Sequence, residues 1–306
     1  MLTCRASARI QKNMLMLTPR QRVITYIAVV VAFALAAHYA APKAGSGASA
    51  FVVMWTPALA ALAASMLTRR SLGAIGWRLW PVKWLAAGWV IPILYAFPAY
   101  ALVWLVGLGS VPSPTFLERA RFTLGMPSAA NWLVIVSAFG YIALVNLPPN
   151  MILTLGEEIG WRGFLVPELT TWVGFRRASL YSGVIWGAWH LPGILTGAYG
   201  TSGTPKVYQL VCFTILVITS AVVQAWLRMR SGSVWPPTIM HATHNGIIQA
   251  FFNRITADTG PTAWFIGEFG VALVPFTAAV AWYCWRHPPT LDAPRPGRVG
   301  GTEESQ

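Results

Sequence analysis

Two adjacent carboxylates, Glu157 and Glu158, stand at the end of a long apolar segment. The sequence has only nine acidic residues, and a carboxylate at membrane depth costs roughly 2.5–3.5 kcal/mol. An acid in that setting is typical of a general base or a proton carrier. Glu158 precedes Arg162 by four residues, the favourable order for an ion pair along a helix. Glu157 is about 100° away around that helix, so it is the predicted reactive carboxylate.

A histidine follows in a segment that is otherwise apolar. His190 lies two residues before Pro192, which predicts that the helix opens or ends nearby. Gly183 and Gly187 have the spacing of small residues at a close helix contact. We therefore expect His190 at a packed helix junction rather than facing lipid.

Three more polar side chains occur together further along the chain. His241 and Asn245 are four residues apart, and His244 lies between them. All three share one broad helix face, with His244 at its edge, about 60° from His241. Together with Glu157, they predict a polar cavity inside a membrane.

The composition indicates a membrane protein. Hydrophobic residues make up 56% of the chain and charged residues 10%, whereas soluble domains carry about 25% charged residues. Apolar runs close to the length of a bilayer span predict an all-α, polytopic helical membrane protein with about eight transmembrane helices. The expected spans cover residues 23–41, 51–67, 84–107, 131–155, 178–195, 207–227, 234–253 and 264–285.

The net charge of +13 does not indicate a nucleic acid partner, because the basic residues follow a topological pattern. With eight spans, 17 of the 22 basic residues fall on the side of both termini. Positive loops remain cytoplasmic, so both termini are expected in the cytoplasm and the lipid bilayer is the expected surrounding. The five basic residues of the other side are Lys43, Arg119, Arg121, Lys206 and Arg254.

Three motifs then carry a resemblance to a known family. Residues 157–162 read Glu-Glu-Ile-Gly-Trp-Arg and match the EExxxR pattern of the CAAX-protease and bacteriocin-processing (CPBP, or Abi) family of intramembrane proteases. Residues 186–190 occupy the place of its FxxxH motif, and residues 241–245 match HxxxN. Trp186 stands where phenylalanine is usual, and we expect a change in packing rather than lost chemistry.

The resemblance implies an intramembrane endopeptidase. Glu157 would be the general base and would share an activated water with His190. His241 and Asn245 would donate hydrogen bonds to the oxyanion of the tetrahedral intermediate. The cofactor is unknown.

Zinc is possible, because Glu157, His190 and His241 could supply three ligands. The family has been described both as metalloproteases and as metal-independent glutamate proteases, and the sequence has no HExxH. We favour the metal-free arrangement, in which Glu158 and Arg162 would contact the catalytic residues without contacting the substrate themselves.

This reading divides the chain into a basic cytoplasmic tail (1–22), an integral membrane protease domain (23–285) and a disordered cytoplasmic tail (286–306). The expected substrate is a membrane-associated peptide or protein: a prenylated CAAX tail, a bacteriocin leader or another membrane peptide. The Abi-like first motif favours a bacterial plasma membrane, which disfavours the prenylated substrate. A proton-coupled transporter and a non-catalytic immunity or scaffold protein remain alternatives. The lack of internal repeats counts against a transporter. The presence of the full Glu/His/His/Asn set counts against a non-catalytic protein.

Overall fold

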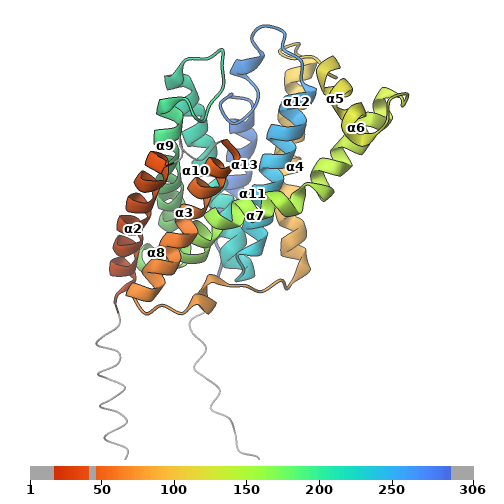
Figure 1. Cartoon of the computed structure of the whole chain (residues 1–306). Helices are drawn as coiled ribbons and strands as arrows, with labels where there is room; N and C mark the ends of the chain where they lie inside the picture. Colours follow the sequence, from red (N-terminus) through yellow and green to blue (C-terminus); the bar gives the residue numbers. More distant parts are fainter. Residues whose placement is uncertain (1–16, 41–45, 291–306) are drawn as a thin grey trace, which may run out of the picture.

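The computed structural model describes residues 17–40 and 46–290, and the regular elements in these ranges are helices (Figure 1). The nearest approach to a strand in these ranges is an isolated antiparallel bridge between Ser110 and Ala257. The predicted all-α class is confirmed. Residues 1–16 and 291–306, which make up most of the two predicted tails, lie outside the described residues.

Five helices form the long elements of the bundle: α2 (Pro19–Ala40), α3 (Ser46–Leu67), α4 (Val82–Leu105), α9 (Phe175–Thr196) and α10 (Lys206–Ser231). Two composite helices contain π-helical segments. The first consists of α6 (Asn131–Gly140), η3 (Tyr141–Val145), α7 (Leu147–Glu158), η4 (Ile159–Leu165) and α8 (Val166–Val173). The second consists of α11 (Trp235–His244), η5 (Asn245–Phe252) and α12 (Asn253–Ile255). The remaining elements are α5 (Pro114–Leu124), α13 (Leu273–Arg286) and the 3₁₀ turns η2 (Leu72–Ile75) and η6 (Thr262–Trp264).

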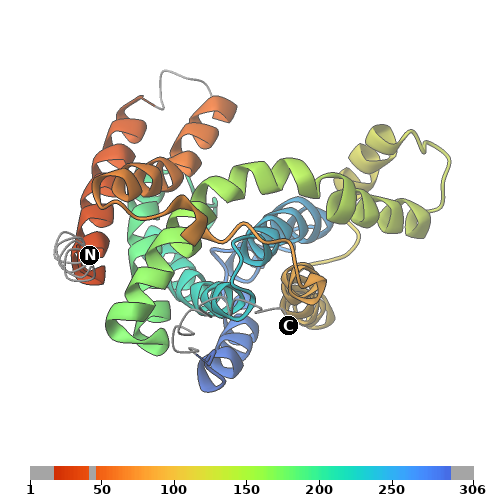
Figure 2. The ribbon, with the colours of Figure 1, turned by 90° about the horizontal axis from the view of Figure 1, so that it is seen from below.

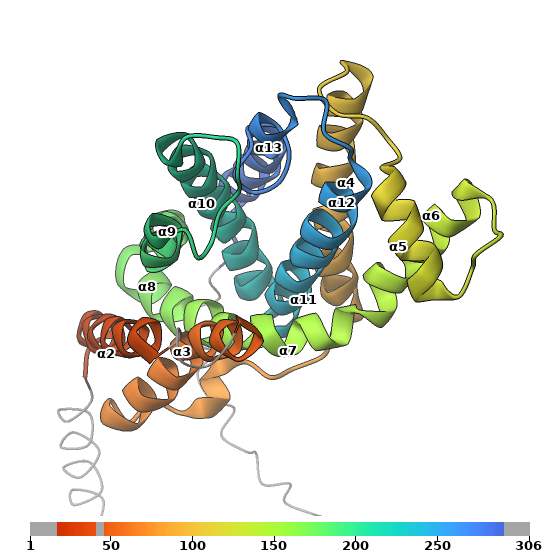
Figure 3. The ribbon, with the colours of Figure 1, turned by 45° about the horizontal axis from the view of Figure 1, so that its top comes forward.

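The first composite helix bends by 44° between η3 and α7. Pro148 and Pro149 occupy the first turn of α7, where a missing N–H costs little, and they interrupt the helix that precedes it. After the bend, α7 crosses the bundle, whereas α4, α10 and α11 run lengthwise (Figures 1 and 2). The crossing helix packs against both α3 and α11, and α5 and α6 project to one side (Figure 3).

Two glycines allow the crossing helix to pack closely against α3. A Cβ atom on Gly156 would lie 2.8 Å from the carbonyl oxygen of Met54, and one on Gly160 would lie 2.5 Å from Cβ of Pro57. These distances are shorter than real Cβ contacts, so only glycine fits at either position. Because the two glycines flank the glutamate pair, this close packing fixes where Glu157 and Glu158 lie.

The predicted close contact at Gly183 is present, since a Cβ there would lie 2.8 Å from Cα of Ile218 on α10. At Gly187 the nearest atom, in Val217, is 3.9 Å away, which is ordinary van der Waals distance. Helix α9 continues past Pro192 and ends at Thr196. His190 therefore lies in the last turns of a helix packed against α10, as expected of a helix junction.

The count of eight spans is not confirmed. Four helices in the described ranges are long and apolar enough to cross a membrane (within Pro19–Tyr39, Ala50–Leu67, Val82–Leu105 and Lys206–Ser231), or five if the bent pair 131–173 is one span. Helix α13 has only 14 residues, about 21 Å at 1.5 Å per residue, which is short of a bilayer core of about 30 Å. The cytoplasmic location of both termini remains a prediction.

Candidate active site

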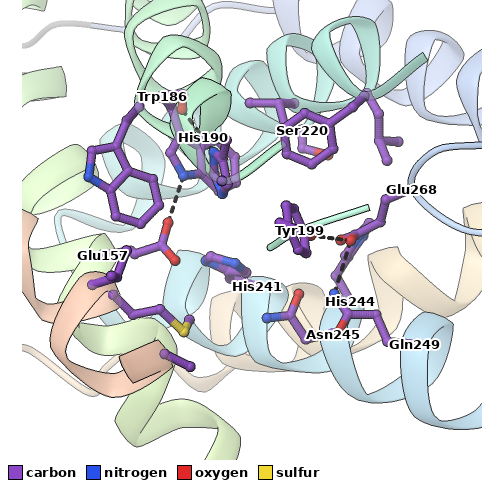
Figure 4. A pocket seen from close by; sticks show the side chains of 18 of the residues that line it. Glu157, Trp186, His190, Tyr199, Ser220, His241, His244, Asn245, Gln249 and Glu268 are labelled. Atoms are coloured by element: carbon purple, nitrogen blue, oxygen red, sulfur yellow. Dashed lines mark hydrogen bonds and ion pairs between the residues drawn. The ribbon is translucent and has the colours of Figure 1, made fainter. Parts of the chain in front are cut away.

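One cavity of about 560 Å³ is lined by all four of the predicted catalytic residues, Glu157, His190, His241 and Asn245 (Figure 4). They come from α7, α9, α11 and the first position of η5. Helices α3 and α10 also contribute to the wall. The fold thus brings together groups that are far apart in the sequence, whereas their individual roles remain predictions.

The Glu157 carboxylate is held by an indole. Its side chain is buried, with 2% of the residue exposed, and its Oε2 accepts a hydrogen bond of 2.6 Å from Nε1 of Trp186. A charged acceptor makes this bond stronger than a neutral one. Oε2 is therefore occupied by the protein, whereas Oε1 has no hydrogen-bond partner among the described residues.

Trp186 also contacts the other side chains of the site. The Arg162 guanidinium lies over its ring at 4.2 Å from the centroid. The rings of His241 and His190 meet it edge to face at 5.3 Å and 5.7 Å. The sequence predicted a change in packing at this position. The structure adds a direct hydrogen bond to Glu157, which phenylalanine could not make.

Glu158 points away from the cavity into the protein. It is fully buried, and its Oε1 lies 2.9 Å from Nη1 of Arg162 and 2.9 Å from Nδ1 of His241. The predicted pairing of Glu158 with Arg162 at a spacing of four residues is confirmed. Neither residue lines the cavity, so the pair can orient His241 without meeting a substrate.

The partners of the two histidines assign their ring protons. Nδ1 of His190 lies 2.9 Å from the carbonyl oxygen of Trp186, which can only accept, so this nitrogen carries the hydrogen. The same reasoning applies to Nδ1 of His241 beside the Glu158 carboxylate. In both rings Nε2 is the nitrogen left for chemistry in the cavity.

The ligand set considered for zinc does not converge. In residues 17–40 and 46–290, no three His, Cys, Asp or Glu side chains are arranged to hold a metal ion. Glu157, His190 and His241 are each turned toward a different protein partner. We therefore derive no step through a metal.

A second polar cluster lines the same cavity and was missed from the sequence. Glu268, in the loop before α13, accepts hydrogen bonds from Nε2 of His244 at 3.0 Å, from Nε2 of Gln249 at 3.0 Å and from the hydroxyl of Tyr199. Nδ1 of His244 is bonded to the hydroxyl of Tyr95 at 2.6 Å. Both ring nitrogens of His244 are thus engaged, unlike those of His241.

The motif that contains Glu157 and Glu158 and the motif that contains Asn245 each adjoin a π-helical segment. Segment η4 begins one residue after Glu158, and η5 begins at Asn245. Such turns are frequent at functional sites, because they widen the helix and turn side chains that an α-helix would not align. Nothing in the sequence pattern signalled them.

A buried ion pair anchors the end of this composite helix at the loop between α3 and α4. Nε of Arg70 lies 2.6 Å from Oε1 of Glu168, and Nη2 donates to the carbonyl oxygen of Gly163 at 3.1 Å. Burial lowers the pKa of Arg70 from its ordinary value, and the adjacent Glu168 carboxylate opposes that shift. The pair ties η4 and α8 to the loop, which holds the glutamates from the C-terminal side.

Comparison with known proteins agrees with the motifs. Residues 130–247 match the family model described as type II CAAX prenyl endopeptidase Rce1-like. A comparison with curated proteins gave no match. The matched segment contains all three motifs and every residue predicted for catalysis. Over residues 130–247 the chain is therefore similar to the Rce1-like type II CAAX prenyl endopeptidases, which confirms the predicted resemblance to the CPBP family.

Proposed function

We propose that the protein is an intramembrane endopeptidase that hydrolyses a peptide bond with a water activated by Glu157 and His190. The observation that carries the proposal is that Glu157, His190, His241 and Asn245 line one cavity. That cavity lies in a chain with four or five apolar helices of membrane-spanning length. The family match supports a protease of this class.

The side-chain atoms that face the cavity can be assigned two roles, one in activating the water and one in binding the oxyanion. Oε1 of Glu157 and Nε2 of His190 would hold the water, and Glu157 would take its proton as the oxygen attacks the carbonyl carbon. The side-chain amide of Asn245 would donate to the developing oxyanion. Glu157 would then return the proton to the leaving amine, so that the acid is regenerated as a carboxylate.

In this scheme His241 must carry a hydrogen on both ring nitrogens in order to bind the oxyanion. With its Nδ1–H directed at Glu158 at 2.9 Å, the ring can donate from Nε2 only as an imidazolium. Burial and the Arg162 cation oppose that charged form, whereas the carboxylates of Glu158 and Glu157 favour it. Glu158 would therefore act through His241, by supplying the negative charge that allows a second donor to the oxyanion.

The substrate that we propose is a membrane-associated peptide or protein. The matched family is named for prenyl CAAX endopeptidases, so a lipidated C-terminal peptide is one candidate. A leader peptide or another unmodified membrane peptide is the other. A cavity of about 560 Å³ is within the range of small-ligand pockets and can hold a short stretch of side chains around the cleaved bond.

The test uses purified protein in proteoliposomes, with matched farnesylated and unmodified peptides and a parallel assay of solute uptake. We expect cleavage by the wild type, no cleavage by Glu157→Gln, and normal cleavage by Glu118→Gln, whose acid is exposed on α5. Substrates that co-purify with Glu157→Gln would identify the natural target. Proton-dependent uptake without any cleavage would instead favour a transporter, and full cleavage by Glu157→Gln would refute the assigned base.

A further inference from the structure

We infer that Trp186 is a positioning residue for catalysis: its indole N–H holds Oε2 of Glu157, which fixes the orientation of this carboxylate and aims Oε1 at the water. The inference rests on the proposed function, because it assigns a role relative to Glu157 as base. The assignment comes from a feature in which this sequence departs from the usual motif, tryptophan where phenylalanine is common.

The contact is specific to an indole. Trp186 is 4% exposed, and its Nε1 reaches Oε2 of Glu157 at 2.6 Å. No other hydrogen bond to the Glu157 side chain occurs among the described residues. A phenylalanine ring could fill much of the same space but has no hydrogen to donate. Glu157 would then keep its burial and lose its donor.

The surroundings strengthen this donor. The Arg162 guanidinium lies over the ring face at 4.2 Å from the centroid, where it is attracted to the π electrons. A cation over the ring draws electron density from the indole and polarises its N–H, and hydrogen bonds polarise one another in a low-dielectric interior. The buried Glu158–Arg162 pair thereby influences Glu157 through Trp186.

One consequence follows for the base. Fixing one oxygen limits rotation of the carboxylate, which places the other oxygen with respect to the water. The other titratable or charged groups close to Glu157 are Tyr26, Glu158, Arg162, His190, Tyr199 and His241, and the substitutions below leave all of them in place.

The test removes only the N–H. Trp186 is replaced by benzothienylalanine, in which sulfur takes the place of the indole nitrogen, and in a second variant by phenylalanine. We expect kcat to fall by about tenfold to a hundredfold with KM nearly unchanged, the scale of one hydrogen bond to a charged group.

The matched control is Trp104→Phe. Trp104 lies on α4 and does not line the cavity, and its Nε1 donates to the hydroxyl of Thr256 at 3.0 Å and not to a carboxylate. Its kcat and KM should match those of the wild type. A wild-type kcat in the benzothienylalanine variant would overturn the inference while leaving the proposed peptidase intact.

An infrared measurement separates this inference from the proposed function. The carboxylate stretching band that Glu157→Gln removes should shift when the indole N–H is replaced by sulfur, whether or not any peptide is cleaved. An unshifted band would overturn the inference. A shifted band in a protein without peptidase activity would support the contact and count only against the proposed function.

Discussion

Substitution of Glu158 by glutamine should damage the protein mainly through stability, although the residue adjoins the proposed base. Glu158 is fully buried and bonded to both Arg162 and His241 at 2.9 Å. The glutamine side chain would keep the shape and lose the charge, leaving Arg162 as a buried cation without its partner. Breaking a buried pair in this way typically costs about 3–5 kcal/mol.

That range is an upper bound here for two physical reasons. The glutamine oxygen can still accept a hydrogen bond from Nη1 of Arg162, and the cation remains over the ring of Trp186 at 4.2 Å from its centroid. We therefore expect a loss of about 3 kcal/mol, at the lower end of the range for a broken buried pair. Activity should fall as well, because His241 loses the charge that favours its imidazolium form.

The assay is unfolding in detergent followed by tryptophan fluorescence, with peptide cleavage measured on the same samples. Glu157→Gln should unfold near the wild-type midpoint and be inactive, whereas Glu158→Gln should unfold much earlier. The double variant Glu158→Gln/Arg162→Met should recover much of the lost stability, because it removes the isolated charge. Wild-type stability in Glu158→Gln, or no recovery in the double variant, would refute the argument from an unpaired buried cation.

Two further predictions concern the histidines and the metal. His241→Ala should eliminate cleavage, whereas His244→Ala should lower it only modestly, because both ring nitrogens of His244 are engaged by Tyr95 and Glu268 and neither is left to meet a substrate. The reverse order of kcat values would mean that the other face of α11 meets the substrate. Cleavage should survive exhaustive treatment with a strong chelator, and zinc that is lost and restored together with activity would show that the metal-free arrangement was the wrong choice.

The sequence was most informative where a short helical spacing determines a contact. The Glu158–Arg162 pair follows from residues four apart on one helix and was predicted from that alone. The membership of Glu157 and His241 in one cavity could not be obtained from spacing, because it depends on how α7 crosses the bundle. Recognition of the motifs, rather than helix geometry, supplied that prediction.

What was missed depends on contacts between distant segments. Trp186 was treated as a packing substitution, because nothing local places its N–H beside Glu157. Glu268 had a usable signal: it is one of only nine acidic residues and falls within the apolar run 264–285. The reasoning that singled out Glu157 would have applied to it equally. The π-helical turns η4 and η5 left no such signal in the sequence.

A pair of adjacent acids suits this site better than one acid, for a reason that lies in helix geometry. Successive residues point about 100° apart, so Glu157 and Glu158 can reach different surroundings. Gly156 and Gly160 bring the helix against α3 and so fix its rotation. Glu157 then faces the cavity, and Glu158 faces Arg162 and His241 behind it. One carboxylate is exposed to the cavity while its neighbour bonds a buried cation and a histidine.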